Sequence, residues 1–490
     1  MLKHHQPKYL LGLTMVALLL RSFRLGFRSI WLDEAYSIKL ANNNLLDIIR
    51  GASQDIHPPL FHILLGPWLK IWGNSEIALR SFSVFWGVLL IPLAYKLVKK
   101  TINARAAWYV AILITFSPYL VELSRMGRMP SLLVFLNLLS WYYLWQFLDT
   151  RKLSYAIIYT IACLASLYTH YFTFLFLLAQ YTFIILNFKM IEKKTRKICW
   201  LLPGVIFLGY LPWLKYCWQH IEKGGPAWRG LGTNWWESIH SLYAFIVGTA
   251  CWSFFNKILV CSIIILAGIF WLVFFIKAKM PFNTLLSSSA AKMLISLLVV
   301  PLLIVGIYSI FKLNIFDNRY LSLSAISLLI LIGVFISRLA FKKSIIIMSL
   351  FLIAFSIPLF NQFFVYGYYD NWRSAAKIIK QEFKAEDEIA IYPAWNQAPL
   401  EYYLKNEFEL KGLPGNYDPI SGITQNYFYI DQQSVSKLEF ILPKQNLGLV
   451  LVNEGKSQVA IQSWCEKNYA IKKSVQIGGI RILVLNSKKL

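Results

Sequence analysis

Long apolar runs recur along the whole chain, and they constrain the fold more than any other feature. Each is close to the roughly 20 residues that cross a hydrocarbon core as a helix. About eleven runs qualify, at 9–26, 77–97, 105–121, 130–148, 154–171, 172–188, 198–216, 257–276, 293–311, 320–337 and 344–362. The pattern predicts a polytopic α-helical membrane protein.

Composition supports this reading and excludes other classes. Hydrophobic residues make up 57% of the 490 residues and charged residues 15%, whereas soluble proteins carry about 25% charged residues. Intrinsic disorder is excluded, because it requires low hydrophobicity. The net charge of +25 is divided among short loops, so it indicates membrane topology and no nucleic-acid partner. The first run, Tyr9–Leu20, is followed by Arg21 and Arg24 without an A-x-A pattern, and we expect an uncleaved first span.

The distribution of Lys and Arg predicts the orientation, since cytoplasmic loops are enriched in both. With the N-terminus in the cytoplasm, the inner loops hold the clusters at 96–105, 151–152, 189–197, 277–292 and 338–343. An odd number of spans then places the C-terminus outside. We expect a multi-pass protein of the cell (inner or plasma) membrane, with a transmembrane domain over 1–362 and an extracytoplasmic domain over 363–490.

The C-terminal region has a different pattern. Trp372–Phe383 predicts an amphipathic helix, and Gln458–Tyr469 a second helix. Glu388–Tyr392, Leu447–Val452 and Ile480–Leu485 predict strands, because they are short and apolar. Together they indicate a small α/β domain.

The first outer loop, 27–76, is not simply polar. Asn42–Asn44 are suited to cap a short helix over Leu45–Arg50. His57-Pro58-Pro59 then opens a second apolar stretch that ends at Trp72. This stretch is too short to span a bilayer, so we expect it to lie in the membrane interface.

An acidic pair lies in this loop, in Trp31-Leu32-Asp33-Glu34-Ala35-Tyr36-Ser37. A carboxylate at the membrane edge is suited to act as a general base. On a helix the two side chains point about 100° apart, so at most one faces a reacting centre. The alternative is that both stabilise a helix start as caps or through the dipole.

Other polar residues are expected at the same membrane face. They are Asp55 and His57 in the first loop, Arg125 and Arg128 between the third and fourth spans, His170 and Tyr171 near a span end, and Arg319 and Tyr320 at the tenth span. Arginine binds phosphate bidentately. The alternatives are membrane anchors for the arginines, a helix cap for His57, a hydrogen bond between helices for His170, and a surface pair of Arg319 with Asp317. His62 is expected to be structural.

These motifs resemble the GT-C glycosyltransferases. The resemblance rests on Trp31–Ser37 with Asp55-Ile56-His57-Pro58-Pro59-Leu60, and continues through Tyr168–Phe172, Asn318–Leu321 and Trp372–Ala376. The nearest group is the polyprenyl-phosphate-sugar-dependent protein mannosyltransferases and aminoarabinose transferases (glycosyltransferase family 39-like).

The resemblance implies an inverting transfer of a sugar from a polyprenyl-phosphate donor to an acceptor. It implies that Asp33 is the general base, that Glu34 orients the site and that Arg128 contacts the phosphate. Met126 and Pro130 stand where the family often has an acid and a tyrosine. No cofactor and no metal-ligand set is predicted. The donor and the bilayer are the expected partners, and the acceptor stays open among protein, lipid and polysaccharide.

Two other functions fit parts of the pattern. A transporter or flippase would also be polytopic, but such proteins often show repeats and polar groups at mid-membrane, and the ionisable residues here cluster at one face. A non-catalytic scaffold of the same fold is the other alternative, which the departures at Met126 and Pro130 leave open. No GxxxxGK[ST], GxSxG or HExxH motif occurs in the sequence.

Overall fold

The computed structural model describes residues 2–222, 243–248, 288–311, 315–365, 371–405, 407–413, 415, 447–452 and 456–487. Contacts divide the chain into two compact units. The first contains Met1–Arg24, Ile56–Phe61 and Arg80–Tyr366, and the second contains Leu25–Asp55, His62–Leu79 and Gly367–Leu490. The second unit therefore combines most of the first loop with the C-terminal region.

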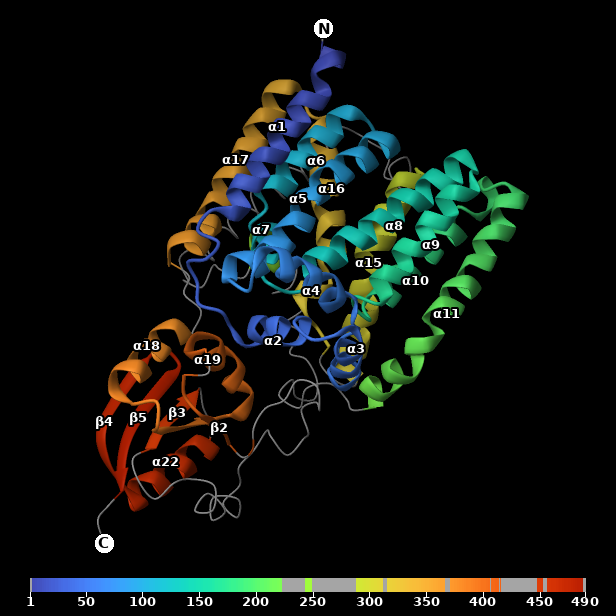
Figure 1. Cartoon of the computed structure of the whole chain (residues 1–490). Coiled ribbons are helices and arrows are strands. Elements are labelled where there is room, and N and C mark those ends of the chain that lie inside the picture. The colour runs from blue at the N-terminus through green and yellow to red at the C-terminus, as the bar shows by residue number, and fades with distance from the viewer. Residues whose placement is uncertain are drawn as a thin grey trace. The chain divides into compact units, whose positions relative to one another are not determined.

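Helices form the first unit (Figure 1). Their bounds are α1 Leu2–Ser22, α5 Glu76–Thr101, α6 Ala104–Phe116, α7 Pro118–Ser124, α8 Pro130–Thr150, α9 Leu153–Leu167, α10 Thr173–Leu186, α11 Lys193–Glu222, α15 Ser289–Phe311, α16 Ser322–Arg338 and α17 Phe341–Phe360, with short turns η1 Phe188–Met190, η3 Asn318–Tyr320 and η4 Asn361–Val365. Leu19, Leu208 and Ile310 are more than half exposed on these helices, as expected of side chains that face lipid.

The helices agree with most of the predicted spans. Ten of the predicted runs coincide with helices, and the run at 257–276 lies outside the described residues. Among the described helices, five are long and apolar enough to cross a membrane, or six if α6 and α7 form one bent span. The helices α9, α10 and α16 are apolar but shorter. The chain is a multi-pass membrane protein, while the number of eleven spans stays a prediction.

The predicted span over 105–121 is broken. Helices α6 and α7 meet at Ser117 with a bend of 58°. Pro118 explains the break, because it has no N–H to donate to the carbonyl of Ile114, four residues earlier. The side chain of Ser117 caps the new helix by accepting a bond from the N–H of Leu120 at 3.4 Å.

The first loop contains three helices, α2 Leu32–Ala41, α3 Leu45–Gln54 and α4 Leu60–Trp72. The predicted cap of α3 is confirmed, since Asn44 Oδ1 accepts the N–H of Asp47 at 3.0 Å. The stretch that ends at Trp72 is helical, as expected. Its position in the membrane interface stays a prediction.

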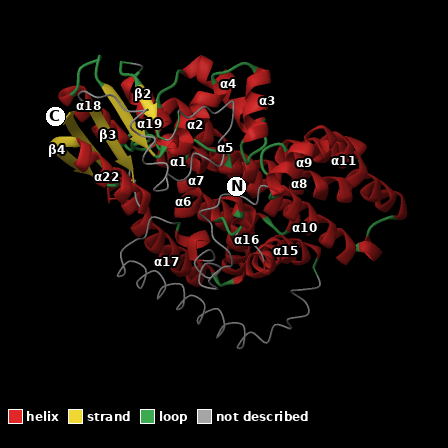
Figure 2. Ribbon diagram, turned by 90° about the horizontal axis from the view of Figure 1, so that it is seen from below, coloured by secondary structure: helices red, strands yellow, loops and turns green. Residues whose placement is uncertain are grey.

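The C-terminal region is an α/β domain with a five-stranded sheet. The strands are β1 Glu388–Tyr392, β2 Leu410–Gly412, β3 Leu447–Val452, β4 Tyr469–Ile477 and β5 Ile480–Ser487, in the order β2-β1-β3-β5-β4. Neighbours β2, β1 and β3 run parallel, whereas β5 is antiparallel to β3 and to β4. In Figure 2, strands (yellow) occur only in this part of the described chain.

The predicted strands of this domain are confirmed, and so are both helices, found as α18 Trp372–Glu382 and α22 Lys456–Asn468. Strands β2 and β4 and the helix α19 Gln397–Leu404 were not predicted. Strand β4 lies at the sheet edge and exposes most of its side chains, so it has no apolar run. Strand β2 has only three residues.

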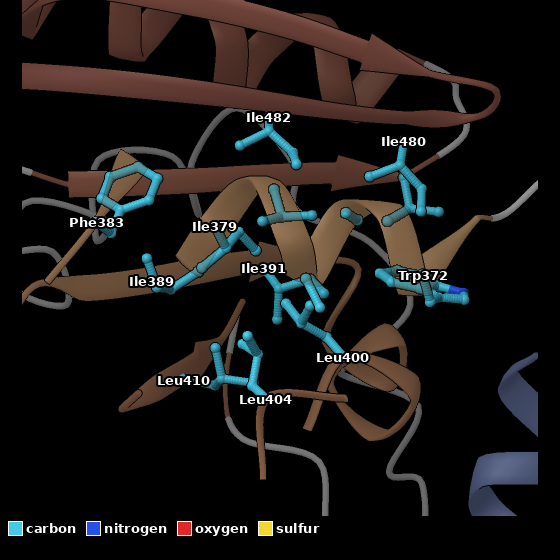
Figure 3. Packing of buried hydrophobic residues seen from close by; sticks show 14 of the residues in the cluster. Trp372, Ile379, Phe383, Ile389, Ile391, Leu400, Leu404, Leu410, Ile480 and Ile482 are labelled. Carbon is cyan, nitrogen blue, oxygen red and sulfur yellow. The ribbon is translucent and has the colours of Figure 1, made fainter. Parts of the chain in front are cut away.

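Alternate residues of the strands face two separate cores. On one face, Ile389 and Ile391 pack with α18 and α19 (Figure 3). On the other face, Ala390 and Tyr392 pack with Ile461 of α22. The period of two in the strands thus produces a three-layer domain with helices on both sides of the sheet.

Candidate functional site

The acid pair lies in the first turn of α2. The N-cap is Trp31, in extended conformation and without a side-chain cap bond, so neither acid occupies the N-cap position. A carboxylate in the first turn is still stabilised by the helix dipole. Glu34 is 1% exposed and Asp33 is half-buried. The pair therefore points in different directions, and Asp33 is the acid that a substrate reaches more easily.

Helix α4 supports α2 through close packing. The rings of Tyr36 and His62 meet edge to face, with centroids 5.7 Å apart, and His62 is fully buried, which fits the structural role predicted for it. A Cβ atom at Gly66 would lie 2.7 Å from the carbonyl oxygen of Ala41, so only glycine permits this approach. Asp55, predicted to bind substrate, is the C-cap of α3.

Three of the predicted residues form one buried group in the first unit, which we call the His–Tyr cluster: His57, His170 and Tyr320. All three are at most 7% exposed. The ring of His170 stacks on that of Tyr320 at 3.7 Å between centroids and 21° between planes. The Nε2 of His57 is 3.1 Å from the hydroxyl of Tyr320. The first loop, the α9–α10 turn and η3 thus meet in one polar cluster.

A local hydrogen bond sets the tautomer of His170. The backbone N–H of Phe172 donates to its Nδ1 at 3.1 Å, so in the neutral ring Nε2 carries the hydrogen. An imidazole N–H of this kind is a donor suited to an anionic oxygen.

Tyr171 makes bonds to α11. Its hydroxyl accepts from Trp213 Nε1 at 3.1 Å and lies 2.7 Å from Nδ1 of His220. An indole nitrogen only donates, so the Tyr171 oxygen is the acceptor from Trp213, while the direction of its bond to His220 follows the tautomer of that ring. The hydroxyl of Tyr171 thus helps to join the α9–α10 turn to α11.

The two arginines of the second outer link have different surroundings. Arg125 donates from Nη1 to the carbonyl of Arg21 at 2.9 Å and from Nη2 to that of Arg24 at 3.2 Å. It thus satisfies carbonyls at the end of α1, where helical partners are missing. Arg128 is 4% exposed, and its own carbonyl accepts from Ser83 at 3.1 Å. The bonds of Arg125 give it a structural role, while the predicted membrane anchoring of the arginines stays a prediction.

Arg319 forms the predicted pair with Asp317. Its Nε and Nη2 reach the two carboxylate oxygens at 3.1 and 2.8 Å, a bidentate arrangement. The Asp317 side chain is only 9% exposed, so the pair is more than a surface contact. The guanidinium carbon also lies 5.3 Å from the centroid of the Tyr320 ring.

Arg21 has a structural role that was not predicted from the sequence. It is fully buried, and it donates to the carbonyls of Ile114 and Thr115, each at 3.0 Å. These carbonyls end α6 at the break made by Pro118. Two features of the sequence point to this role: Arg21 ends the first apolar run, and Pro118 interrupts the run at 105–121.

Asp33, Glu34 and Asp55 belong to the second unit, and the remaining predicted site residues belong to the first. Within the described ranges, no group of three or more His, Cys, Asp or Glu residues could hold a metal ion. The second unit contains a half-buried carboxylate, and the first unit contains a buried guanidinium and the His–Tyr cluster. Carboxylates serve in proton transfer and guanidinium groups in phosphate binding.

Known proteins are similar to this chain in sequence and in fold. The family model described as dolichyl-phosphate-mannose-protein mannosyltransferase matches residues 56–216. Dolichyl-phosphate-mannose–protein mannosyltransferase 6 of Candida albicans is 29% identical over 26% of this chain. The match spans 17% of that protein's length.

Solved structures match the chain from end to end. ArnT from Cupriavidus metallidurans, solved in the apo state and bound to undecaprenyl phosphate, has a TM-score of 0.65 and 14% identity, and the match covers 98% of both chains. The archaeal oligosaccharyltransferase AglB from Archaeoglobus fulgidus has a TM-score of 0.51 and 13% identity over 99% of this chain and 75% of its own. The predicted resemblance to GT-C glycosyltransferases is confirmed, and the chain has their fold.

Proposed function

From this fold, we propose that the chain is a membrane glycosyltransferase that moves a sugar from a polyprenyl-phosphate donor to an acceptor. The end-to-end match with ArnT, which has been solved with undecaprenyl phosphate, carries the proposal. The match of residues 56–216 to a mannosyltransferase family model supports it independently. The sugar and the acceptor class are left open.

Asp33 is the proposed general base. Its half-buried position in the first turn of α2 supports this role, because a base must meet its substrate. The carboxylate accepts the proton of an acceptor hydroxyl while the hydroxyl oxygen attacks the anomeric carbon. The bond to the donor phosphate breaks, the polyprenyl phosphate leaves with the electron pair, and the configuration at the anomeric carbon inverts. Buried Glu34 orients the helix turn that carries Asp33.

Arg128 is the proposed contact of the donor phosphate. It is a buried cation, and a guanidinium binds phosphate bidentately. The His–Tyr cluster supplies neutral donors for the phosphate or the sugar, and Arg319, Tyr171 and Asp55 complete the proposed set of substrate-binding residues. The reaction is proposed for the outer face of the cell membrane, with the N-terminus cytoplasmic and the C-terminal domain extracytoplasmic.

The scaffold alternative rests on the second outer link. Pro130 is the first residue of α8, a position that proline favours, so it begins a helix where the family often has a tyrosine. A scaffold would keep the fold and transfer no sugar, and a flippase would move a lipid-linked sugar without cleaving it. Release of lipid phosphate distinguishes both from a transferase.

The test is incubation of the purified protein with a panel of polyprenyl-phosphate sugars, scoring release of the lipid phosphate. Asp33→Asn should lower the rate by about 10²–10⁴, the usual effect of losing a base, with unchanged folding and membrane insertion. Asp47→Asn is the matched control, because Asp47 lies in the same loop and pairs with the exposed Arg50. Full activity of Asp33→Asn would remove this residue from the base role, and no release from any donor by the wild type would refute the transferase.

A further inference from the structure

Helix α19 of the C-terminal domain lies against the helix that carries Asp33. At the last turn of α2, Lys39 Nζ is 2.9 Å from Oε2 of Glu401. The other carboxylate oxygen of Glu401 accepts from Gln397 Nε2 at 2.8 Å. The ion pair is therefore held in place on the α19 side, which lowers the entropy cost of forming it.

The same helix also contacts the chain that enters α2. The hydroxyl of Tyr403 accepts the backbone N–H of Ile30 at 2.7 Å and donates to Glu76 Oε1 at 2.6 Å. Arg373 Nη2 reaches the same oxygen of Glu76 at 2.6 Å and the carbonyl of Gly26 at 3.0 Å. The segment that precedes α2 is thus bonded to two helices of the C-terminal domain, α18 and α19.

The chemistry of Tyr403 suits a permanent contact. Burial raises the pKa of its hydroxyl to about 12, so the phenol keeps its proton and donates over the whole physiological range. Phenylalanine at this position would leave the N–H of Ile30 without this acceptor, which destabilises the contact because unpaired buried donors are costly.

We propose that α19 acts as a brace that holds α2 at both ends, and that Tyr403 and Glu401 are positioning residues for Asp33. Ile30 lies three residues before Asp33, and Lys39 lies six residues after it, so the two contacts restrict both rotation and tilt of the helix between them. The effect of these contacts on catalysis rests on the proposed function. The restraint of α2 rests on the observed contacts alone. It gives the C-terminal domain a part in the reaction itself.

The first measurement is hydrogen exchange of the peptide that spans residues 30–41 in the full-length protein. Tyr403→Phe and Glu401→Gln should each speed its exchange, because the backbone of α2 opens more often when its ends are released. Glu407→Gln is the matched control. It breaks an ion pair with Lys380, at 2.6 Å, in the same domain and away from α2. Unchanged exchange in both test variants would overturn the brace.

The second measurement separates positioning from general stability. With a donor that the wild type uses, both test variants should lower kcat by about 10- to 100-fold, the effect of a small misplacement of a catalytic group, while the KM for the donor stays within about twofold. Glu407→Gln should keep the wild-type kcat. A loss that appears only in KM, or a kcat equal to that of the wild type despite faster exchange, would overturn the positioning role.

Charge reversal provides a rescue test. Lys39→Glu and Glu401→Lys should each lower kcat, and the double variant should recover most of it, because an opposite pair is restored. Failure of the double variant to exceed the better single variant would contradict the pairing. If the wild type transfers no sugar from any donor, the proposed transferase fails, and the exchange measurement alone decides whether α19 holds α2.

Discussion

Replacing Arg21 by methionine tests whether one buried cation stabilises the break between α6 and α7. The side chain is fully buried, and it donates to the carbonyls of Ile114 and Thr115 at 3.0 Å and to Ser124 Oγ at 3.2 Å. Methionine has a similar length and no donor, so the substitution removes these bonds with little change in packing volume.

The expected magnitude follows from the two carbonyls. Each buried acceptor left without its donor costs about 1–3 kcal/mol, which gives about 2–6 kcal/mol for the pair. Removing a guanidinium also removes its own desolvation cost, so we expect a net loss toward the lower part of that range, about 2–4 kcal/mol. Ser124 keeps its bond to the carbonyl of Leu120 at 2.6 Å and contributes little to the loss.

The assay is thermal unfolding of the purified protein in detergent, comparing variants at one scan rate. Arg21→Met should lower the midpoint by about 4–16 °C, because each kcal/mol corresponds to about 2–4 °C for large domains. The matched control is Arg151→Met, since Arg151 pairs with Glu192 at 2.8 Å on the surface and such pairs contribute at most about 1 kcal/mol. Equal midpoints for the two variants would refute the reasoning.

A second substitution tests the cause. Pro118→Ala restores the N–H that the carbonyl of Ile114 lacks. In the Arg21→Met background it should therefore cost less than it does in the wild type, with a coupling of about 1 kcal/mol between the two sites. Strict additivity would show that Arg21 does not replace the missing donor.

The other predictions concern separate parts of the molecule. Gly248→Ala should destabilise by about 1–3 kcal/mol, because its φ is +76° and a Cβ would lie 2.8 Å from a buried carboxylate of α7; Gly306→Ala, with open space around it, should be neutral or slightly stabilising in the same thermal assay. Arg128→Ala should weaken binding of a polyprenyl-phosphate sugar, and Arg125→Ala should mainly lower the unfolding temperature; the reverse pattern would contradict both assignments. Because the pKa of Tyr403 is raised to about 12, its stabilisation should be full below about pH 10 and be lost as pH rises toward 12, and Tyr403→Phe should abolish that part of the alkaline transition.

Much of the local structure could be predicted from the sequence. The strands at 388–392 and 447–452 have the predicted bounds, because a short apolar run carries its own signal of a buried strand. The helix cap at Asn44 was also predictable from the sequence, because a capping side chain bonds to an N–H only three residues away. Strand β4 was missed because an exposed edge strand needs no apolar pattern.

The contacts that organise the candidate site join residues that are far apart in the sequence. Tyr403 and Ile30 are 373 positions apart, and His57 and Tyr320 are 263 apart. Arg128, which is proposed to bind a phosphate, and Arg125, which satisfies helix-end carbonyls, look alike in the sequence. Their roles depend on which backbone groups the folded chain brings within reach.

By itself, then, the sequence determined most of the helices and the buried strands, which residues are too apolar for water, and which family of folds the chain resembles. Those properties depend on neighbouring residues and on burial, and they are repeated over many positions. Only the tertiary structure decided that Arg21 supports the α6–α7 break and that α19 is bonded to the last turn of α2 and to the segment before its first turn. Each of these contacts joins distant positions through one or two hydrogen bonds, which have a strict range of about 3 Å and leave no periodic trace in the chain.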